Sequence, residues 1–268
     1  MATDKIRVVV VGAKGRMGRE CVKSLMNEEG LEFVGAVDRT LDGVPVADVL
    51  GFECNGVLFS NDLGKALIET QADVMVDLTN PTVIKQNIEK AIELGVRPVV
   101  GTTGMTPEQI ADWDKRCKER EIGGLIAPNF AIGAILMMRF AAQAAKYLPH
   151  VEIIELHHDN KLDAPSGTAL KTLELIAKER EAMQQGNPNE HEAIPHSRGG
   201  NYEGMRVHSV RLPGYVAHQE VILGGLGQIL SIRHDSMNRE SFMPGIMLSC
   251  KLVMKYEGLV YGLENLLD

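Results

Sequence analysis

The first half of the chain alternates short apolar runs with longer segments of helical character, which is the pattern of a parallel α/β sheet. Residues 82–94 are predicted to be helical, and a further helix is predicted to begin after Thr106, with Pro107 at its first position. The apolar runs resemble buried parallel strands and lie at 6–11, 31–37, 73–78, 98–100 and 123–126. We therefore expect a Rossmann-like, doubly wound parallel sheet that binds ligands beyond the carboxyl ends of its strands.

The second half of the chain has a different pattern, in which β-rich runs follow one another closely. They lie at 151–156, 205–212, 216–223 and 228–234, and they predict an open, mixed and largely antiparallel sheet of four strands. The polar stretch 184–204 is predicted to be a mobile loop. Helices are predicted over 131–148, 169–183 and 242–256, and the last of them returns the chain to the first domain. We expect one domain of residues 1–130 completed by 240–268, and a second α+β domain of residues 131–239.

A glycine-rich turn follows the first strand directly and indicates a dinucleotide site in the first domain. Three glycines form a G-x-x-G-x-x-G pattern at 12–18 between strand and helix, and Asp38 ends the next strand. Glycines let the backbone approach a pyrophosphate, and an acid at that strand end accepts ribose hydroxyls. Asp38 favours NAD and Arg39 favours NADP, although Arg39 could also be a solvated surface charge, so both cofactors stay open. The expected contacts are Gly12, Ala13, Lys14, Gly15, Arg16, Met17, Asp38 and Arg39.

The loops after the later strands are expected to line the nicotinamide end of this site. They lie beyond the carboxyl ends of neighbouring strands, where open α/β sheets bind their ligands. The loop at Thr79-Asn80 is one of them, and any of these loops taken alone could be an ordinary turn between strand and helix. The other candidate contacts are Gly101, Thr102, Thr103, Ala127, Pro128, Asn129 and Phe130.

The stretch 155–169 contains most of the side chains that could bind a small ligand or transfer a proton in the second domain. A strand leads into it, and Ser166 is a good N-cap for the helix that follows. The N–H groups of Gly167 and Thr168 at that helix start suit a carboxylate. Lys161 adds a positive charge, and His157 and His158 offer proton donors near neutral pH. The stretch therefore predicts a seat for a small acidic molecule beside a proton source.

Composition indicates which partners, which cellular compartment and which metal content to expect. The 268 residues carry a net charge of −8, which argues against nucleic acid and anionic membranes as partners. The four cysteines are scattered without a C-x-x-C pair, which favours reduced, buried thiols in the cytoplasm. We expect no secretory signal and no membrane span. The histidines show no zinc-site spacing, and those at 208, 218 and 234 are interpreted as surface or interface residues of strands, so no metal is expected.

The motifs taken together resemble the 4-hydroxy-tetrahydrodipicolinate reductase family over essentially the whole chain. The most specific of them is the stretch H-H-D-N-K-L-D-A-P-S-G-T at 157–168, supported by the glycine turn, by G-T-T-G at 101–104 and by A-P-N-F at 127–130. The resemblance implies reduction of a small cyclic dicarboxylate with NADH or NADPH in the diaminopimelate route to lysine. It also implies a homotetramer assembled through the second domain, which would bind the substrate.

The resemblance also implies roles for individual residues. His157 is expected to donate or accept a proton, Lys161 to transfer protons and contact a carboxylate, and His158, Gly167 and Thr168 to bind substrate. Two alternatives stay open on the residues alone. One is a different two-domain NAD(P)-dependent dehydrogenase, such as one acting on an amino-acid semialdehyde. The other is a nicotinamide sensor without turnover, for which the His157–Lys161 cluster would have no use.

Overall fold

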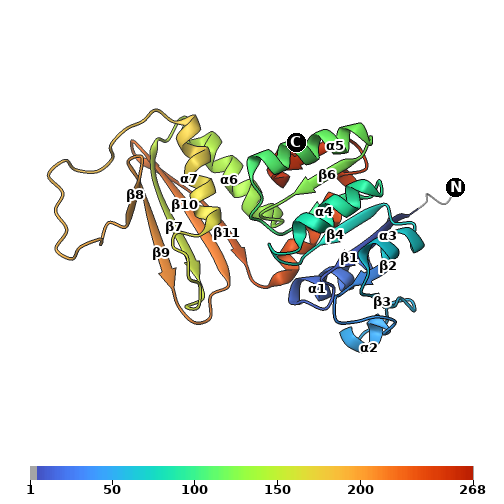
Figure 1. Cartoon of the computed structure of the whole chain (residues 1–268). Coiled ribbons are helices and arrows are strands. Elements are labelled where there is room, and N and C mark those ends of the chain that lie inside the picture. Colours follow the sequence, from blue (N-terminus) through green and yellow to red (C-terminus); the bar gives the residue numbers. More distant parts are fainter. Residues whose placement is uncertain (1–4, 268) are drawn as a thin grey trace. The chain divides into compact units, whose positions relative to one another are not determined.

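The computed structural model describes residues 5–267 and divides into two compact units (Figure 1). Unit 1 contains the described residues up to Phe130 and those from Phe242 onward, so the C-terminal segment completes it. Unit 2 is the continuous segment Ala131–Ser241. Among the described residues, no helix is both long and apolar enough to cross a membrane.

Unit 1 is built on a seven-stranded sheet in the order β12-β6-β5-β4-β1-β2-β3, with every neighbouring pair parallel. The order reverses at β1, which pairs with both β2 and β4. This confirms the predicted doubly wound, Rossmann-like fold and adds two edge strands, β3 and β12, that the apolar pattern did not reveal. The strands are β1 Ile6–Val11, β2 Leu31–Val37, β3 Phe59–Ser60, β4 Val74–Asp77, β5 Arg97–Val100, β6 Gly123–Ile126 and β12 Gly258–Tyr261.

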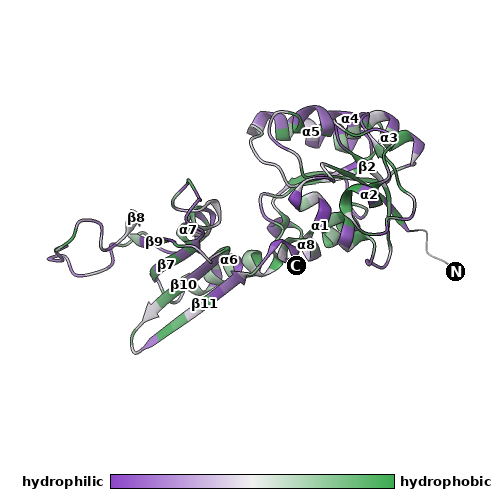
Figure 2. Ribbon diagram, turned by 90° about the horizontal axis from the view of Figure 1, so that it is seen from below, coloured by the Kyte–Doolittle hydropathy of each residue, from purple (hydrophilic) through white to green (hydrophobic). Residues whose placement is uncertain are grey.

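Helices cover both faces of this sheet. On one face, α1 and α8 pack together, and α8 contacts β1, β4 and β5; on the other face, α3, α4 and α5 lie side by side (Figure 1). Figure 2 shows hydrophilic residues along α3, α4 and α5 on the side away from the sheet. The helices are α1 Arg16–Leu25, α2 Val46–Leu50, α3 Leu63–Glu69, α4 Ile84–Glu93, α5 Pro107–Glu119 and α8 Met243–Leu252.

The buried side of these helices follows from their sequence. In α4, isoleucines at 84, 88 and 92 recur every fourth residue and form one apolar stripe, which is fully buried. Trp113 and Cys117 of α5 repeat that spacing and join the same core cluster. The start of α5 is fixed by a capping box, in which the Thr106 side chain accepts from the N–H of Gln109 and the Gln109 side chain accepts from the N–H of Thr106.

Unit 2 is an open, mixed sheet in the order β11-β10-β7-β9-β8, with α6 and α7 on one face. The central pair β7 and β9 is parallel, and the other pairs are antiparallel. The predicted number of four strands is wrong, because a fifth strand, β8, forms within the stretch expected to be loop. The elements are α6 Ile132–Ala145, β7 His150–His157, α7 Gly167–Glu179, β8 Gly200–Tyr202, β9 Met205–Arg211, β10 Ala217–Gly225 and β11 Gln228–Ser236.

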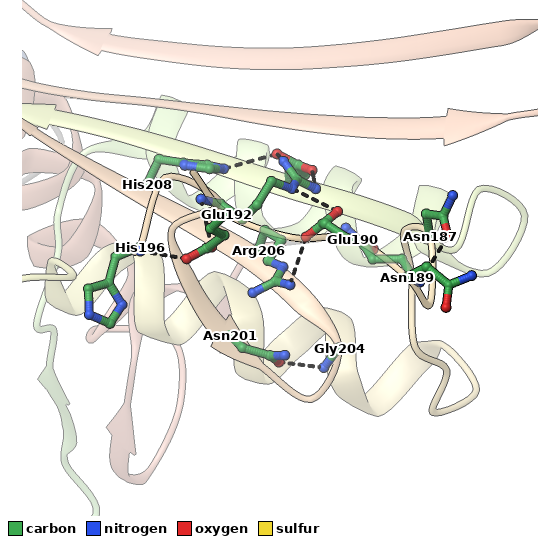
Figure 3. Close-up of polar contacts among 12 residues, drawn as sticks. Asn187, Asn189, Glu190, Glu192, His196, Asn201, Gly204, Arg206 and His208 are labelled. Carbon is green, nitrogen blue, oxygen red and sulfur yellow. Dashed lines mark hydrogen bonds and ion pairs between the residues drawn. The ribbon is translucent and has the colours of Figure 1, made fainter. Parts of the chain in front are cut away.

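The long connection from α7 to β8 is held against the sheet by a network of ion pairs (Figure 3). Glu152 of β7 pairs with Arg198 at 2.6 Å and also contacts the ring of His208 at 2.9 Å. Glu190 of the connection lies between Arg198 and Arg206. The sequence suggested only a polar loop, since the partners of these charges lie on strands far along the chain.

Candidate active site

The strand register of unit 2 places a row of polar side chains just beyond its apolar core. Side chains alternate between the two faces of a strand, so residues two apart on β7 share a face. Val151 and Ile153 are fully buried in the core. The next residues on that face are Glu155, opposite Gln219 of β10, and His157, opposite Arg211 of β9. The polar row therefore lies beside the start of α7, where Ser166 donates to Glu155 and Gln219 donates to Thr172.

Glu155 is the centre of this row and is completely buried. It accepts two hydrogen bonds from the Arg211 guanidinium, at 2.7 and 2.9 Å, a bidentate pair. It also contacts Nδ1 of His157 at 2.5 Å and accepts from the N–H of Ser166 at 3.3 Å. Burial alone would raise the pKa of the Glu155 carboxyl, but hydrogen bonds from His157 and Arg211 outweigh it and lower that pKa to about 2. Glu155 is thus ionised at neutral pH.

The loop after β7 carries the other polar residues of the cluster. Lys161 Nζ contacts both carboxylate oxygens of Asp163, at 2.7 and 2.9 Å. Arg211 donates to the backbone carbonyl of Asp163 at 2.8 Å, so the same guanidinium binds Glu155 and this loop. Ser166 caps α7 by accepting from the N–H of Ala169. The ring of His158 is exposed to solvent.

In unit 1, the glycine turn has the geometry that a bound pyrophosphate requires. Gly12 has φ +79°, in the region that side chains rarely adopt, and a Cβ there would lie 3.2 Å from the carbonyl of Leu78. A Cβ at Gly18 would lie only 2.1 Å from the carbonyl of Gly12, so α1 packs directly against the turn. Since α1 begins at Arg16, its first N–H groups are oriented out of the helix start. The turn therefore fits a dinucleotide phosphate.

The end of β2 carries one acid and two cations close to that turn. Asp38 Oδ1 accepts from the N–H and the hydroxyl of Thr40, at 3.0 and 2.7 Å. Lys14 from the glycine turn reaches the same hydroxyl at 3.5 Å. Arg39 is exposed beside them. One edge of the turn thus carries a carboxylate, which can accept from hydroxyl groups, and two cations, which can pair with a phosphate.

A cavity of about 220 Å³ opens at the carboxyl ends of β1, β4, β5 and β6. Its apolar walls and backbone groups suit a flat aromatic amide such as nicotinamide. The expected residue Thr103 does not line it, whereas Phe242 from the C-terminal segment does. The full lining is Met17, Leu78, Thr79, Gly101, Thr102, Ala127, Pro128, Asn129, Phe130 and Phe242.

One wall of this cavity is shaped by a buried carboxylate. Asp77 ends β4 with no exposed surface, and it accepts from the N–H and the hydroxyl of Thr79 and from the amide of Asn87. Burial raises the pKa of the Asp77 carboxyl above its ordinary value, although these hydrogen bonds act in the opposite direction. Asp77 fixes the turn that brings Thr79 to the cavity, a role that the sequence alone did not indicate.

The described residues therefore contain two chemically different sites. Unit 1 offers a dinucleotide site, and unit 2 offers a histidine, a lysine and a helix N-terminus, which together can bind carboxylates and exchange protons. The sequence analysis did not identify Glu155, Arg211, Asp77 or Phe242. Glu155 could have been identified from the sequence, because it lies two residues before His157 and therefore on the same face of the predicted strand. Across residues 5–267, no group of three or more His, Cys, Asp or Glu side chains is placed to hold a metal ion.

Comparison of the sequence with protein families gives two matches that cover nearly the whole chain. Residues 6–130 match the family described as dihydrodipicolinate reductase, N-terminus, and residues 133–267 match dihydrodipicolinate reductase, C-terminus. A 4-hydroxy-tetrahydrodipicolinate reductase of Halalkalibacterium halodurans is 57% identical over 263 residues, 98% of this chain and 100% of the relative. One of Desulfitobacterium hafniense is 54% identical over 265 residues, 98% of this chain and 99% of the relative.

Solved structures show the same similarity. The dipicolinate-bound dihydrodipicolinate reductase of Paenisporosarcina sp. TG-14 superposes with a TM-score of 0.89 at 46% identity, covering 98% of this chain and 100% of that one. An amine dehydrogenase of Mycobacterium smegmatis, at 16% identity, has a TM-score of 0.69 over 98% of this chain and 96% of its own. The second likeness concerns the fold alone.

Proposed function

Since the chain belongs to the dihydrodipicolinate reductase family, we propose that it reduces 4-hydroxy-tetrahydrodipicolinate to tetrahydrodipicolinate with NADH or NADPH. The reaction is a step of lysine biosynthesis through diaminopimelate. The observation that best supports the proposal is the polar cluster of unit 2, where a proton donor, a cation and a helix N-terminus lie within one short stretch. The cation and the helix N-terminus suit the two carboxylates of the substrate, and the proton donor suits its reduction.

The substrate would bind through its two carboxylates. The N–H groups of Gly167 and Thr168 occupy the first turn of α7, where the helix dipole favours negative charge. Lys161 supplies a positive charge to a carboxylate once its contact with Asp163 is exchanged for the ligand. His158 is exposed at the start of the same loop and would contact the substrate from there.

In the chemical step, loss of the ring hydroxyl as water would give a conjugated imine, and the chemistry that a reduced nicotinamide would supply when bound is a hydride for ring C4. Negative charge then develops along the C3–C2–N atoms, and C3 must be protonated. We assign that proton to His157, whose Nδ1 is bound by Glu155, so that Nε2 is the atom available for transfer. Lys161 stabilises the charge of the dianion and assists in proton transfer.

The cofactor would bind unit 1. The glycine turn from Gly12 to Met17 would hold the pyrophosphate, and the cavity lined by Gly101, Thr102 and Ala127–Phe130 would hold the nicotinamide. Thr103 follows the cavity wall and is exposed, so any contact that it makes would be at the rim.

A synthase-coupled assay tests the proposed activity. Pyruvate and aspartate semialdehyde, condensed by the synthase, would supply the unstable substrate to the purified protein, and loss of NADH or NADPH absorbance would be followed. We expect cofactor oxidation that depends on the synthase. Cofactor binding without synthase-dependent oxidation would instead favour the sensor, or another dehydrogenase.

Cofactor choice is expected to depend on Arg39. Replacing Arg39 by Ala removes a cation from the edge where a 2′-phosphate would bind, beside Asp38 and Lys14. We expect KM for NADPH to rise about tenfold and KM for NADH to change little, because a charge-assisted hydrogen bond is lost only with the phosphate. Both constants come from the coupled assay at fixed ionic strength.

A matched control is Arg120→Ala. Arg120 is also an exposed arginine of unit 1, but it caps the carboxyl end of α5, away from the strand ends that form the cofactor site. We expect neither KM to change in this variant. If KM for NADH and KM for NADPH rose equally in Arg39→Ala, Arg39 would not discriminate between the two cofactors.

We also propose that the chain assembles as a cytoplasmic homotetramer through the sheet of unit 2. The helices α6 and α7 cover one face of that sheet, while the other face carries partly exposed apolar side chains such as Ile154, Leu156 and Ile229. Apolar surface of this kind is typical of an interface. Light scattering of the purified protein would give the number of subunits.

A further inference from the structure

We propose that Glu155, clamped by Arg211, is a positioning residue that fixes the tautomer of His157 and so makes Nε2 the atom that transfers the proton. This inference rests on the proposed function for its catalytic consequence, while the tautomer can be measured without turnover. It adds two residues to the chemical machinery, neither of which lies within the stretch 157–168.

The hydrogen bond with the Glu155 carboxylate determines which ring nitrogen of His157 carries the proton. An ionised carboxylate has no proton to donate, so it can only accept hydrogen bonds. Glu155 Oε2 contacts Nδ1 of His157 at 2.5 Å, and Nδ1 must therefore carry a hydrogen. In the neutral ring, Nε2 then holds the lone pair; in the imidazolium, Nε2 holds the transferable proton.

Arg211 keeps the carboxylate in place and ionised. Its two hydrogen bonds to Glu155 leave the carboxylate no freedom to rotate away from the His157 ring. The same guanidinium donates to the backbone carbonyl of Asp163. One arginine thus connects the strand that carries His157 with the loop that carries Lys161.

Few other charges face this histidine. From its own strand it meets Glu155, and from β9 it meets Arg211, which is paired in register with it. On β10 the residue opposite is the uncharged Ala217. The loop after β7 contributes Lys161 and Asp163, which neutralise each other in a direct ion pair. Glu155 is therefore the negative group bonded directly to the ring.

The proton balance of the step follows from this arrangement. The imidazolium gives its Nε2 proton to C3 of the enamine, whose π electrons form the new C–H bond. The ring is left neutral with Nδ1–H still bound to Glu155. No rotation or second proton shift is needed to return to the starting state, because only Nε2 has to be protonated again by solvent.

The decisive variant is Glu155→Gln, assayed from about pH 5 to pH 9. The neutral amide removes the negative charge beside the ring, which disfavours the imidazolium. When its oxygen accepts from Arg211, its N–H₂ can donate to Nδ1, which favours the opposite tautomer. We expect kcat to fall about tenfold to a hundredfold. We also expect the decrease of kcat on the alkaline side of its pH profile to occur about one pH unit lower than in the wild type. An unchanged pH profile would refute the proposal.

Two further variants separate positioning from a loss of structure. Glu155→Asp keeps the carboxylate and is expected to restore part of kcat and of the pH profile. Thr172→Val removes two other hydrogen bonds beside the polar row, one donated by Gln219 and one donated to the carbonyl of Thr168, without touching His157. It is expected to lower thermal stability and to leave the pH profile unchanged. A shift of the profile in Thr172→Val would assign the effect to packing instead.

A double-mutant cycle and a spectrum complete the test. If Glu155 acts through His157, adding Glu155→Gln to His157→Gln should cause no further loss of kcat. The nitrogen chemical shifts of ¹⁵N-labelled histidine, assigned with His157→Gln, should show Nδ1–H and an unprotonated Nε2 at high pH. A wild-type ring protonated at Nε2 would overturn the proposal even in a protein without reductase activity, whereas absent turnover with the expected tautomer would overturn only the proposed function.

Discussion

Replacing His157 by Gln is expected to lower kcat by about 10²–10⁴-fold with only a modest change in KM. Loss of a general acid removes an interaction made in the transition state, so the effect appears in kcat rather than in binding. Gln keeps a similar size and can still donate a hydrogen bond, but it cannot transfer a proton. The synthase-coupled assay at saturating substrate measures the change.

The control for this variant is His208→Gln. His208 also lies on a strand of unit 2 beside a glutamate, here Glu152. It is paired in register with Ile154, so its side chain is on the opposite face of the sheet from that of His157. We expect kcat close to that of the wild type in this control. An unchanged kcat in His157→Gln would remove His157 from the role of proton donor and would leave Lys161 as the candidate.

The architecture of unit 1 could be predicted because its central strands are buried on both faces and therefore consist of continuous apolar runs. The predicted runs 6–11, 31–37 and 123–126 coincide with β1, β2 and β6. The edge strand β3 has only two residues, and β12 lies more than 130 residues beyond its partner β6. A strand of two residues is too short to show a hydrophobic pattern, and the pairing of β12 with β6 cannot be inferred from residues that are neighbours in the sequence.

The start of α1 also depends on tertiary contacts, because the sequence has helical character from Arg19 onward whereas α1 begins three residues earlier. Gly18 is a poor helix former, yet it lies inside the first turn of α1, which begins at Arg16. The close approach of Gly18 to the glycine turn is a tertiary contact, and it overrides local propensity. Likewise, β8 forms because its residues pair with β9, which the polar composition of 184–204 concealed.

For the site of unit 2, the sequence indicated most of the residues that lie together in the chain, although it missed Glu155, and it gave no indication of Arg211. His157, Lys161 and Gly167 lie within one stretch that ends in a recognisable helix cap. Arg211 is 56 residues from Glu155, and only the parallel pairing of β7 with β9 brings the two together. Parallel pairing needs a long crossover connection, and no hairpin signal announces it.

Replacing Lys161 by Ala is expected to damage both kinetic constants, lowering kcat by about 10²-fold and raising KM by about tenfold or more. The ammonium would contact a substrate carboxylate in the ground state and stabilise the dianion in the transition state, so its loss affects binding and chemistry together. The contact of Lys161 Nζ with both oxygens of Asp163 shows that a carboxylate fits beside it. Initial rates over a range of substrate concentrations separate the two constants.

Two further variants serve as comparisons for Lys161→Ala. Lys178→Ala removes an exposed lysine from the last turn of α7, at the opposite end of the helix from the carboxylate seat, and should leave both constants unchanged. Asp163→Asn removes the carboxylate that competes with substrate for Lys161, so KM should fall or stay constant while kcat is retained. A wild-type KM in Lys161→Ala would show that Lys161 does not bind substrate. The loss in kcat would then report proton transfer alone, and the N-terminus of α7 would be left as the main carboxylate site.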